Sequence, residues 1–206
     1  PNNPTGSVLP YEELISIIRK AARNDILVVV DEAYFYFYHR TVIKEVKKFD
    51  NLIVLRTFSK LCGLASARLG YAAASPGIIT ALNKVKPTYD VNGIAVLFAG
   101  RLLADKRLIP ALVKTVADGN GYLVKQLSKN GIEHVAGNAN FVLIRCPGTA
   151  AEIGRRLKLK GILVHNGFKQ PFLKDYLRVT TGDKGVMKKF WSSFIKVRKA
   201  ILESDE

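Results

Sequence analysis

Apolar residues recur every three or four positions over residues 10–24, and they are Leu14, Ile17, Ile18, Ala21 and Ala22. Acidic residues stand near the start of this stretch and basic residues near its end, which is the arrangement that the helix dipole favours. Period and charge placement together predict an amphipathic helix over residues 10–24.

Three short runs further along the chain are typical of β-strands. ILVVV at residues 26–30 is an unbroken, β-branched run, which predicts a strand buried on both faces of its sheet. NLIVLRT at 51–57 predicts a second buried strand, and LGYAAAS at 69–75 predicts a third. The polar stretch that ends at Lys48 is expected to contain a short helix. Strands that alternate with helices predict an α/β fold with a sheet covered on both sides.

The second half of the chain has a different pattern of predicted elements. Helical patterns cover residues 77–85, 93–105 and 107–129, the last weakened by Gly119 and Gly121. Beyond them follow FVLIRC (141–146), a helix over 149–159, GILVH (161–165), YLRVT (176–180) and a terminal helix over 184–203. These later elements predict a small α+β domain, so we expect two domains, 1–115 and 116–206.

Composition excludes several classes of protein. Of the 206 residues, 48% are hydrophobic and 24% are charged, as in folded globular chains and unlike disordered ones. No apolar run approaches the length needed to cross a bilayer, so we expect no membrane partner, and whether a targeting signal precedes residue 1 stays open. The two cysteines, Cys62 and Cys146, stand in different contexts, which indicates a reducing compartment and favours the cytoplasm.

The net charge of +15 is unusual and could attract nucleic acid or an anionic metabolite. The lysines of the last segment, however, alternate with apolar residues at helical spacing, as on the solvated face of a helix. No base-stacking motif or recognition helix is apparent, so we predict no nucleic-acid partner. His39, His134 and His165 show no ligand spacing with the cysteines, so we also predict no metal site.

Chemically distinctive residues follow the predicted strands. DEAY (31–34) follows the first strand, TFSK (57–60) follows the second, and PNNPTG (1–6) precedes the first helix. Ligands of open α/β sheets bind outside the carboxyl ends of the strands, where loops converge and helix N-termini offer N–H groups. The three segments are therefore predicted to share one pocket.

Each segment also has a purely structural interpretation. PNNPTG has the composition of a turn, and Asp31 could cap the next helix. Lys60 could be an ordinary surface lysine, and Arg68 could pair with a surface carboxylate. The order and spacing in which these segments occur favour the shared pocket over four separate explanations.

Four motifs together, PNNPTG, DEAY, RTFSKLCGLASARLGY and YLRVTTG, resemble those of the class I and II aminotransferases, pyridoxal phosphate (PLP) enzymes of fold type I. The resemblance covers essentially the whole chain and is strongest to the histidinol-phosphate aminotransferase branch. It implies that residues 1–115 are the C-terminal part of a large, mainly parallel-sheet cofactor domain and that 116–206 are the small C-terminal domain. Family members carry a long portion before PNNPTG with further phosphate and ring contacts, so this chain alone is expected to bind the cofactor incompletely.

The resemblance assigns roles at the reacting centre. Lys60 is implied to form the Schiff base with the cofactor aldehyde and, once substrate has freed it, to move a proton as a neutral amine. Asp31 is implied to pair with the protonated pyridine nitrogen, which keeps the ring an electron sink. Tyr34 and Asn3 are implied to hydrogen-bond the phenolic oxygen of the cofactor. Lys60, Asp31 and Tyr34 are therefore the candidate catalytic residues.

The resemblance also assigns anion-binding residues. Thr57, Ser59 and Arg68 surround the lysine, and in the family the serine and the arginine bind the cofactor phosphate. Arg178 in YLRVTTG matches the residue that clamps the substrate carboxylate or its equivalent. His165 stands where the histidinol-phosphate branch usually has an arginine for the substrate phosphate. It is either a weaker donor to that phosphate or a surface histidine at a strand end.

The function implied is transfer of an amino group between an amino-acid-like donor, with histidinol phosphate the leading candidate, and 2-oxoglutarate. A loop with Tyr89, Asp90 and Asn92 matches one that approaches the neighbouring active site in relatives, which implies a homodimer. Two alternatives stay open. One is a PLP-dependent decarboxylase of a phosphorylated amino acid, and the other is an aminotransferase-like domain of a transcription regulator, which the positive charge would suit.

Overall fold

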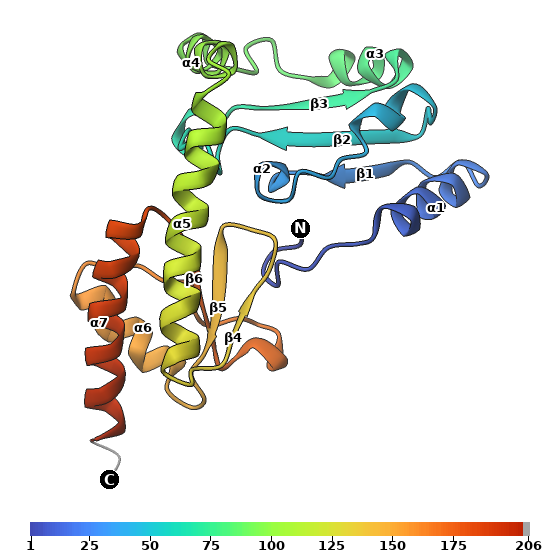
Figure 1. The fold of residues 1–206 in the computed structure, drawn as a ribbon. Coiled ribbons are helices and arrows are strands. Elements are labelled where there is room, and N and C mark those ends of the chain that lie inside the picture. The colour runs from blue at the N-terminus through green and yellow to red at the C-terminus, as the bar shows by residue number, and fades with distance from the viewer. Residues whose placement is uncertain (204–206) are drawn as a thin grey trace. The chain divides into compact units, whose positions relative to one another are not determined.

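Two separate three-stranded sheets organise the chain in the computed structural model, which describes residues 1–203 (Figure 1). The first compact unit comprises Pro1 and Ser7–Val113, and the second comprises Asn2–Gly6 and the chain from Lys114 onward. The short segment Asn2–Gly6 thus belongs with residues more than a hundred positions away. The predicted domains 1–115 and 116–206, with the roles assigned to them, stay a prediction.

The first unit contains a sheet of mixed direction. Strands β1 (Val28–Asp31) and β2 (Leu52–Thr57) run parallel, and β3 (Gly70–Ala74) pairs antiparallel with β2. All three strands that the sequence predicted in this half are present. Only one of the two pairings is parallel, because the connection over residues 58–69 holds no helix longer than the single 3₁₀ turn η2 (Ala65–Ala67), whereas a parallel return needs a long crossover.

Helix α1 (Tyr11–Ala22) covers one face of this sheet. Its residues Ile15 and Ile18 pack against Leu52 and Val54 of β2 in a common apolar cluster. The prediction that ILVVV is buried on both faces is wrong for this chain, because Val29 is 53% exposed. Side chains alternate between the faces of a strand, so Val29 points to the face that α1 leaves uncovered.

The remaining helices of the first unit connect and flank the strands. After β1 come helix α2 (Phe35–Tyr38) and the 3₁₀ helix η1 (Ile43–Lys47), and after β3 come α3 (Pro76–Val85) and α4 (Gly93–Ala104). Asn92 caps α4, since its Oδ1 accepts the backbone N–H groups of Ile94 at 2.8 Å and Ala95 at 3.4 Å. Within residues 1–203, no helix combines the length and apolar character needed to cross a membrane.

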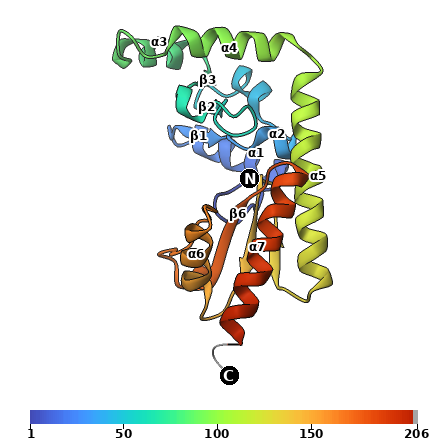
Figure 2. The same cartoon turned by 90° about the vertical axis from the view of Figure 1, so that its left-hand side faces the viewer.

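The second unit is an antiparallel sheet with helices on one side (Figures 1 and 2). Its elements are α5 (Leu108–Lys129, which begins in the first unit), β4 (His134–Ala136), β5 (Phe141–Arg145), α6 (Ala150–Leu159), the 3₁₀ helix η3 (Pro171–Leu173), β6 (Tyr176–Thr180) and α7 (Lys184–Leu202). Apolar residues of α5, α6 and α7 form one cluster with those of β5 and β6. The Asp183 side chain caps α7 by accepting the N–H groups of Gly185 and Val186.

Two details of this unit differ from the sequence prediction. GILVH at 161–165 is not a strand: only His165 forms an isolated bridge to β6, while Ile162 and Val164 pack sideways against the apolar cluster. Strand β4 was not predicted, because three residues are too few to display an alternating pattern.

Helix α5 passes without interruption through both glycines that were expected to weaken it. Packing requires glycine at position 119, since a Cβ on Gly119 would lie 1.9 Å from the carbonyl oxygen of Gly182. The backbone of α5 therefore meets the turn before α7 at a distance that only glycine permits. Gly121, two positions further, faces open space.

These two glycines make a matched pair. Gly119→Ala is expected to lower the free energy of unfolding by about 1–3 kcal/mol, because the added methyl overpacks a backbone contact. Gly121→Ala is expected to raise it by about 0.5–1 kcal/mol, because alanine favours the helix. Urea unfolding followed by the fluorescence of Trp191, the one tryptophan of the sequence and part of this unit, measures both effects. Equal shifts in the two variants would contradict the close approach at Gly119.

Candidate functional site

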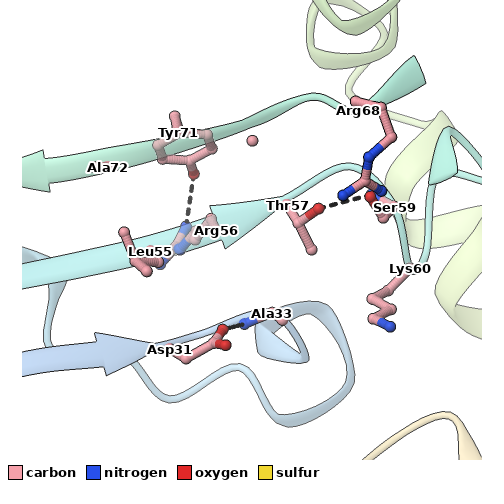
Figure 3. A pocket seen from close by; sticks show the side chains of 11 residues that line it. Asp31, Ala33, Leu55, Arg56, Thr57, Ser59, Lys60, Arg68, Tyr71 and Ala72 are labelled. Carbon is pink, nitrogen blue, oxygen red and sulfur yellow. Dashed lines mark hydrogen bonds between the residues drawn. The ribbon is translucent and has the colours of Figure 1, made fainter. Parts of the chain in front are cut away.

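A pocket of about 580 Å³ opens at the ends of the strands of the first unit (Figure 3). Its lining includes Asp31 at the end of β1, Ser59 and Lys60 after β2, and Arg68 before β3. Leu55, Arg56, Thr57, Gly70, Tyr71, Ala72 and Ala33 complete it. The structure thus brings together the carboxylate, amine and guanidinium that the sequence predicted to share a site.

Asp31 is exposed and stands at the last position of β1. Its Oδ1 accepts the backbone N–H of Ala33 at 2.8 Å, a bond that turns the chain away from the strand and fixes the direction of the carboxylate. Helix α2 begins only after Tyr34, whose side chain makes no capping bond. Asp31 is therefore not a helix cap, and its carboxylate faces the pocket (Figure 3).

The amine of Lys60 lies beside an aromatic ring. Its Nζ is 5.4 Å from the centroid of Tyr34, close enough for an attraction between the ammonium and the ring face. Tyr34 itself is buried, with only 8% of its surface exposed. Cys62, two positions beyond the lysine, is half-buried, and burial raises the pKa of its thiol, which keeps the thiol protonated at neutral pH. Cys62 therefore serves packing.

The loop after β2 is shaped by Thr57. The Thr57 hydroxyl accepts the N–H of Ser59 at 3.0 Å (Figure 3). It also donates to the carbonyl of Leu69 at 3.3 Å, which joins the two ends of the loop. Arg68 closes the loop in the left-handed region, with φ of 53°, and its Nη1 donates to the carbonyl of Ala65. Within residues 1–203, Arg68 forms no ion pair with a carboxylate, contrary to the structural alternative considered for it.

Three further sequence candidates gather in the second unit. Asn3 accepts a hydrogen bond from the Arg178 guanidinium, which also stands 5.5 Å from the centroid of Phe141. His165 and Arg178 exchange both backbone hydrogen bonds, at 3.1 and 2.8 Å, so they are opposed across the bridge. Directly opposed residues of an antiparallel pair project on the same side. The side chains of His165 and Arg178 therefore lie on the same side of the sheet.

The PNNPTG segment is held on this unit by its backbone. Gly6 has φ of 72°, and a Cβ on Gly137 would lie 2.6 Å from the Cα of Gly6, so neither position admits a side chain without displacement. The carbonyl of Gly6 accepts the N–H of Asn138 at 2.9 Å. The segment is a turn, as its composition indicates, and the turn is docked beside the β4–β5 connection with Asn3 directed to Arg178.

Comparison with known proteins identifies the family. The model of "Aminotransferase class I and II" matches residues 1–194. The chain belongs to the class I and II aminotransferase family. It is 41% identical over 181 residues to histidinol-phosphate aminotransferase of Caldanaerobacter subterraneus subsp. tengcongensis, an alignment that covers 87% of this chain and 50% of that protein.

Solved structures show the same fold as this chain. The histidinol-phosphate aminotransferase of Sinorhizobium meliloti, in complex with pyridoxal-5′-phosphate, matches with a TM-score of 0.87 and 27% identity, over 98% of this chain and 56% of that one. L-threonine-O-3-phosphate decarboxylase from Porphyromonas gingivalis matches with a TM-score of 0.80 and 24% identity, over 98% and 62%. The fold is therefore that of the fold type I PLP-dependent enzymes, and the chain spans about half the length of the curated relatives that it matches.

The donor set of the pocket fits the cofactor of this family. An amine, a carboxylate, and a hydroxyl beside a guanidinium are the groups that an aldehyde, a protonated pyridine nitrogen and a phosphate require. Among the side chains of residues 1–203, no three of His, Cys, Asp and Glu gather where they could hold a metal ion.

Sequence reasoning missed one feature of the pocket. Arg56 lines it and forms an ion pair with Glu32 at 2.9 Å, with 11% and 7% of the two side chains exposed. A signal was present, because Arg56 interrupts the apolar run of β2 and Glu32 follows the aspartate of DEAY. Charges in such positions are rarely buried unless they are paired.

Thr57 offers a test of the loop geometry. Thr57→Val removes the acceptor of the Ser59 N–H, so we expect local opening to become easier by about 1–2 kcal/mol. Amide hydrogen exchange at Ser59 measures this change. Thr57→Ser keeps the hydroxyl and is the control, with exchange close to that of the parent chain. Equal protection of Ser59 in the valine and serine variants would show that the hydroxyl does not hold the loop.

Proposed function

We propose that the chain takes part in a PLP-dependent aminotransferase reaction that moves an amino group between histidinol phosphate and 2-oxoglutarate. The observation that carries the proposal is the shared pocket of Asp31 and Lys60, with Ser59 and Arg68 at the same opening, in a member of this family. The matched relatives support the choice of donor, since the Caldanaerobacter and Sinorhizobium proteins are both histidinol-phosphate aminotransferases.

Five residues of the first unit would hold the cofactor. Lys60 attaches it, Asp31 receives its ring nitrogen, Tyr34 contacts its ring oxygen, and Ser59 and Arg68 take its phosphate. When bound, the cofactor supplies an electron sink for the pair left at the substrate Cα. Lys60 Nζ then acts as the base that removes the Cα proton and returns it. Thr57 acts indirectly, because its hydroxyl positions Ser59.

The second unit would recognise the substrate. Arg178 offers a guanidinium fork, and both the phosphate of the donor and the carboxylates of the acceptor are oxyanions that such a fork binds in two-point fashion. His165 adds a donor on the same surface, in a role weaker than that of the arginine usual at this position. Asn3 accepts a hydrogen bond from Arg178 and, by its place in the family motif, is assigned to the ring oxygen of the cofactor.

A homodimer in the cytoplasm fits these roles. Tyr89, in the loop before α4, is 95% exposed, and the apolar side chains of Ile94, Leu97 and Phe98 on α4 are more than half exposed. An apolar surface of this extent is typical of a protein–protein interface. A second copy that covers α4 would bring the loop with Tyr89, Asp90 and Asn92 to its neighbour.

Product analysis tests the reaction. With histidinol phosphate and 2-oxoglutarate, we expect glutamate to form in step with loss of the donor amine, measured by chromatography. Omission of 2-oxoglutarate is the control and should limit the loss of donor amine to one equivalent per active site, because only the first half of the reaction can occur without an acceptor. Release of CO₂ from a phosphorylated amino acid such as O-phosphothreonine, without glutamate, would instead support the decarboxylase alternative.

Covalent trapping tests the lysine. Borohydride reduction in the presence of PLP is expected to leave a stable adduct on the peptide that contains Lys60, because reduction fixes an amine to the aldehyde that it holds. Mass spectrometry locates the adduct. Lys60→Ala is expected to abolish it, and Lys86→Ala, which removes an exposed lysine of the same unit, is expected to leave it intact. An adduct that persists in Lys60→Ala would move the attachment site elsewhere.

A further inference from the structure

Arg56 lines the pocket and forms an ion pair with Glu32, the residue that follows β1. Arg56 Nε and Nη2 approach the same Glu32 oxygen, Oε2, at 3.0 and 2.9 Å. The other oxygen, Oε1, accepts the backbone N–H of Val42 at 2.9 Å. Both oxygens of this buried carboxylate are thus engaged.

The remaining donors of Arg56 reach other elements. Nη2 also donates to the Thr41 hydroxyl at 2.8 Å, and that hydroxyl donates in turn to Glu32 at 2.7 Å. Nη1 donates to the Tyr71 hydroxyl at 3.3 Å (Figure 3). The guanidinium also stacks 3.6 Å from the ring centroid of Phe35. One side chain therefore joins the residue that follows β1, helix α2, the segment before η1, and β3.

Members of this network are chain neighbours of residues assigned to the cofactor. The three neighbour pairs are Asp31–Glu32, Tyr34–Phe35 and Arg56–Thr57. Fixing the network member of each pair, which is Glu32, Phe35 or Arg56, restricts the backbone of its neighbour. A flat guanidinium that holds a carboxylate at one edge and a ring at its face leaves little freedom to either.

We infer that Arg56 is a positioning residue. By holding Glu32 and Phe35, it restricts the backbone of their chain neighbours Asp31 and Tyr34. Thr57 follows Arg56 directly in the chain and is restricted in the same way. The expected effect on cofactor binding rests on the proposed function. The positioning of the segment by Arg56 does not, because it concerns contacts within the chain alone. The Ala33 amide donates to Asp31 and the Phe35 amide donates to the carbonyl of Glu32, so their hydrogen exchange reports directly on the positioned segment.

Arg56→Lys in the full chain is the test. Lysine keeps the charge but cannot make the fork to Glu32, the bond to Tyr71 and the stacking on Phe35 at once. We expect exchange at Ala33 and Phe35 to accelerate by about tenfold or more, while amides in the centre of β2 stay within about twofold. We expect the dissociation constant of PLP to rise by about tenfold. The control is Arg145→Lys, the same substitution in the exposed ion pair with Glu133. It should change neither the hydrogen exchange of Ala33 and Phe35 nor the dissociation constant of PLP.

Thr41→Val is the second variant and guards against misfolding of the first. It keeps the ion pair and removes the hydroxyl shared by Arg56 and Glu32, so the same amides should accelerate by a smaller factor. Unchanged exchange at Ala33 and Phe35 in Arg56→Lys would overturn the inference, and so would a uniform acceleration that includes β2, since that marks a general loss of stability. Failure of the parent chain to bind PLP would count against the proposed function alone, because the exchange measurement decides the positioning role without cofactor.

Discussion

The parallel pairing of β1 with β2 is the constraint on which the pocket depends. Their register, with Asp31 opposite Leu55, ends both strands at one edge of the sheet, so DEAY and TFSK emerge side by side. The antiparallel direction of β3 then completes the arrangement. Because Gly70 pairs with Thr57, β3 begins where β2 ends, and Arg68 arrives at the edge that carries Lys60. A parallel β3 would have begun at the opposite edge.

The second unit depends on a different constraint, which is the close approach of backbones. Gly119 of α5 contacts the turn before α7, and Gly6 contacts Gly137 beside the β4–β5 connection. In both places a backbone segment fills the space that a side chain would take. The close contact between the two main chains therefore fixes the position of the residues beside it. The Asn3 side chain reaches Arg178 from such a support, which gives the guanidinium of Arg178 a defined neighbour.

The sequence predicted the elements better than their environment. Long periodic segments such as α1 and α7, and the β-branched runs of β1 and β2, carry their own signal. The direction of β3 and the exposure of Val29 depend on what lies beside a strand, which periodicity does not encode. The strand prediction for GILVH was wrong for the same reason, since its apolar residues can pack against a cluster formed with helices as well as in a sheet. The pocket residues were found because order and spacing of motifs hold information that single residues lack.

The network around Arg56 escaped prediction because its members look ordinary one at a time. A buried ion pair adds little net stability, since the cost of removing two charges from water offsets most of their attraction. Apolar residues of similar size would serve packing as well, but they would not fix direction. Hydrogen bonds from one guanidinium to Glu32, Thr41 and Tyr71 do so, because each bond restricts both distance and angle. A largely covered, partly exposed arginine at this position is therefore better explained by the orientation of the residues around the pocket than by the stability of the sheet.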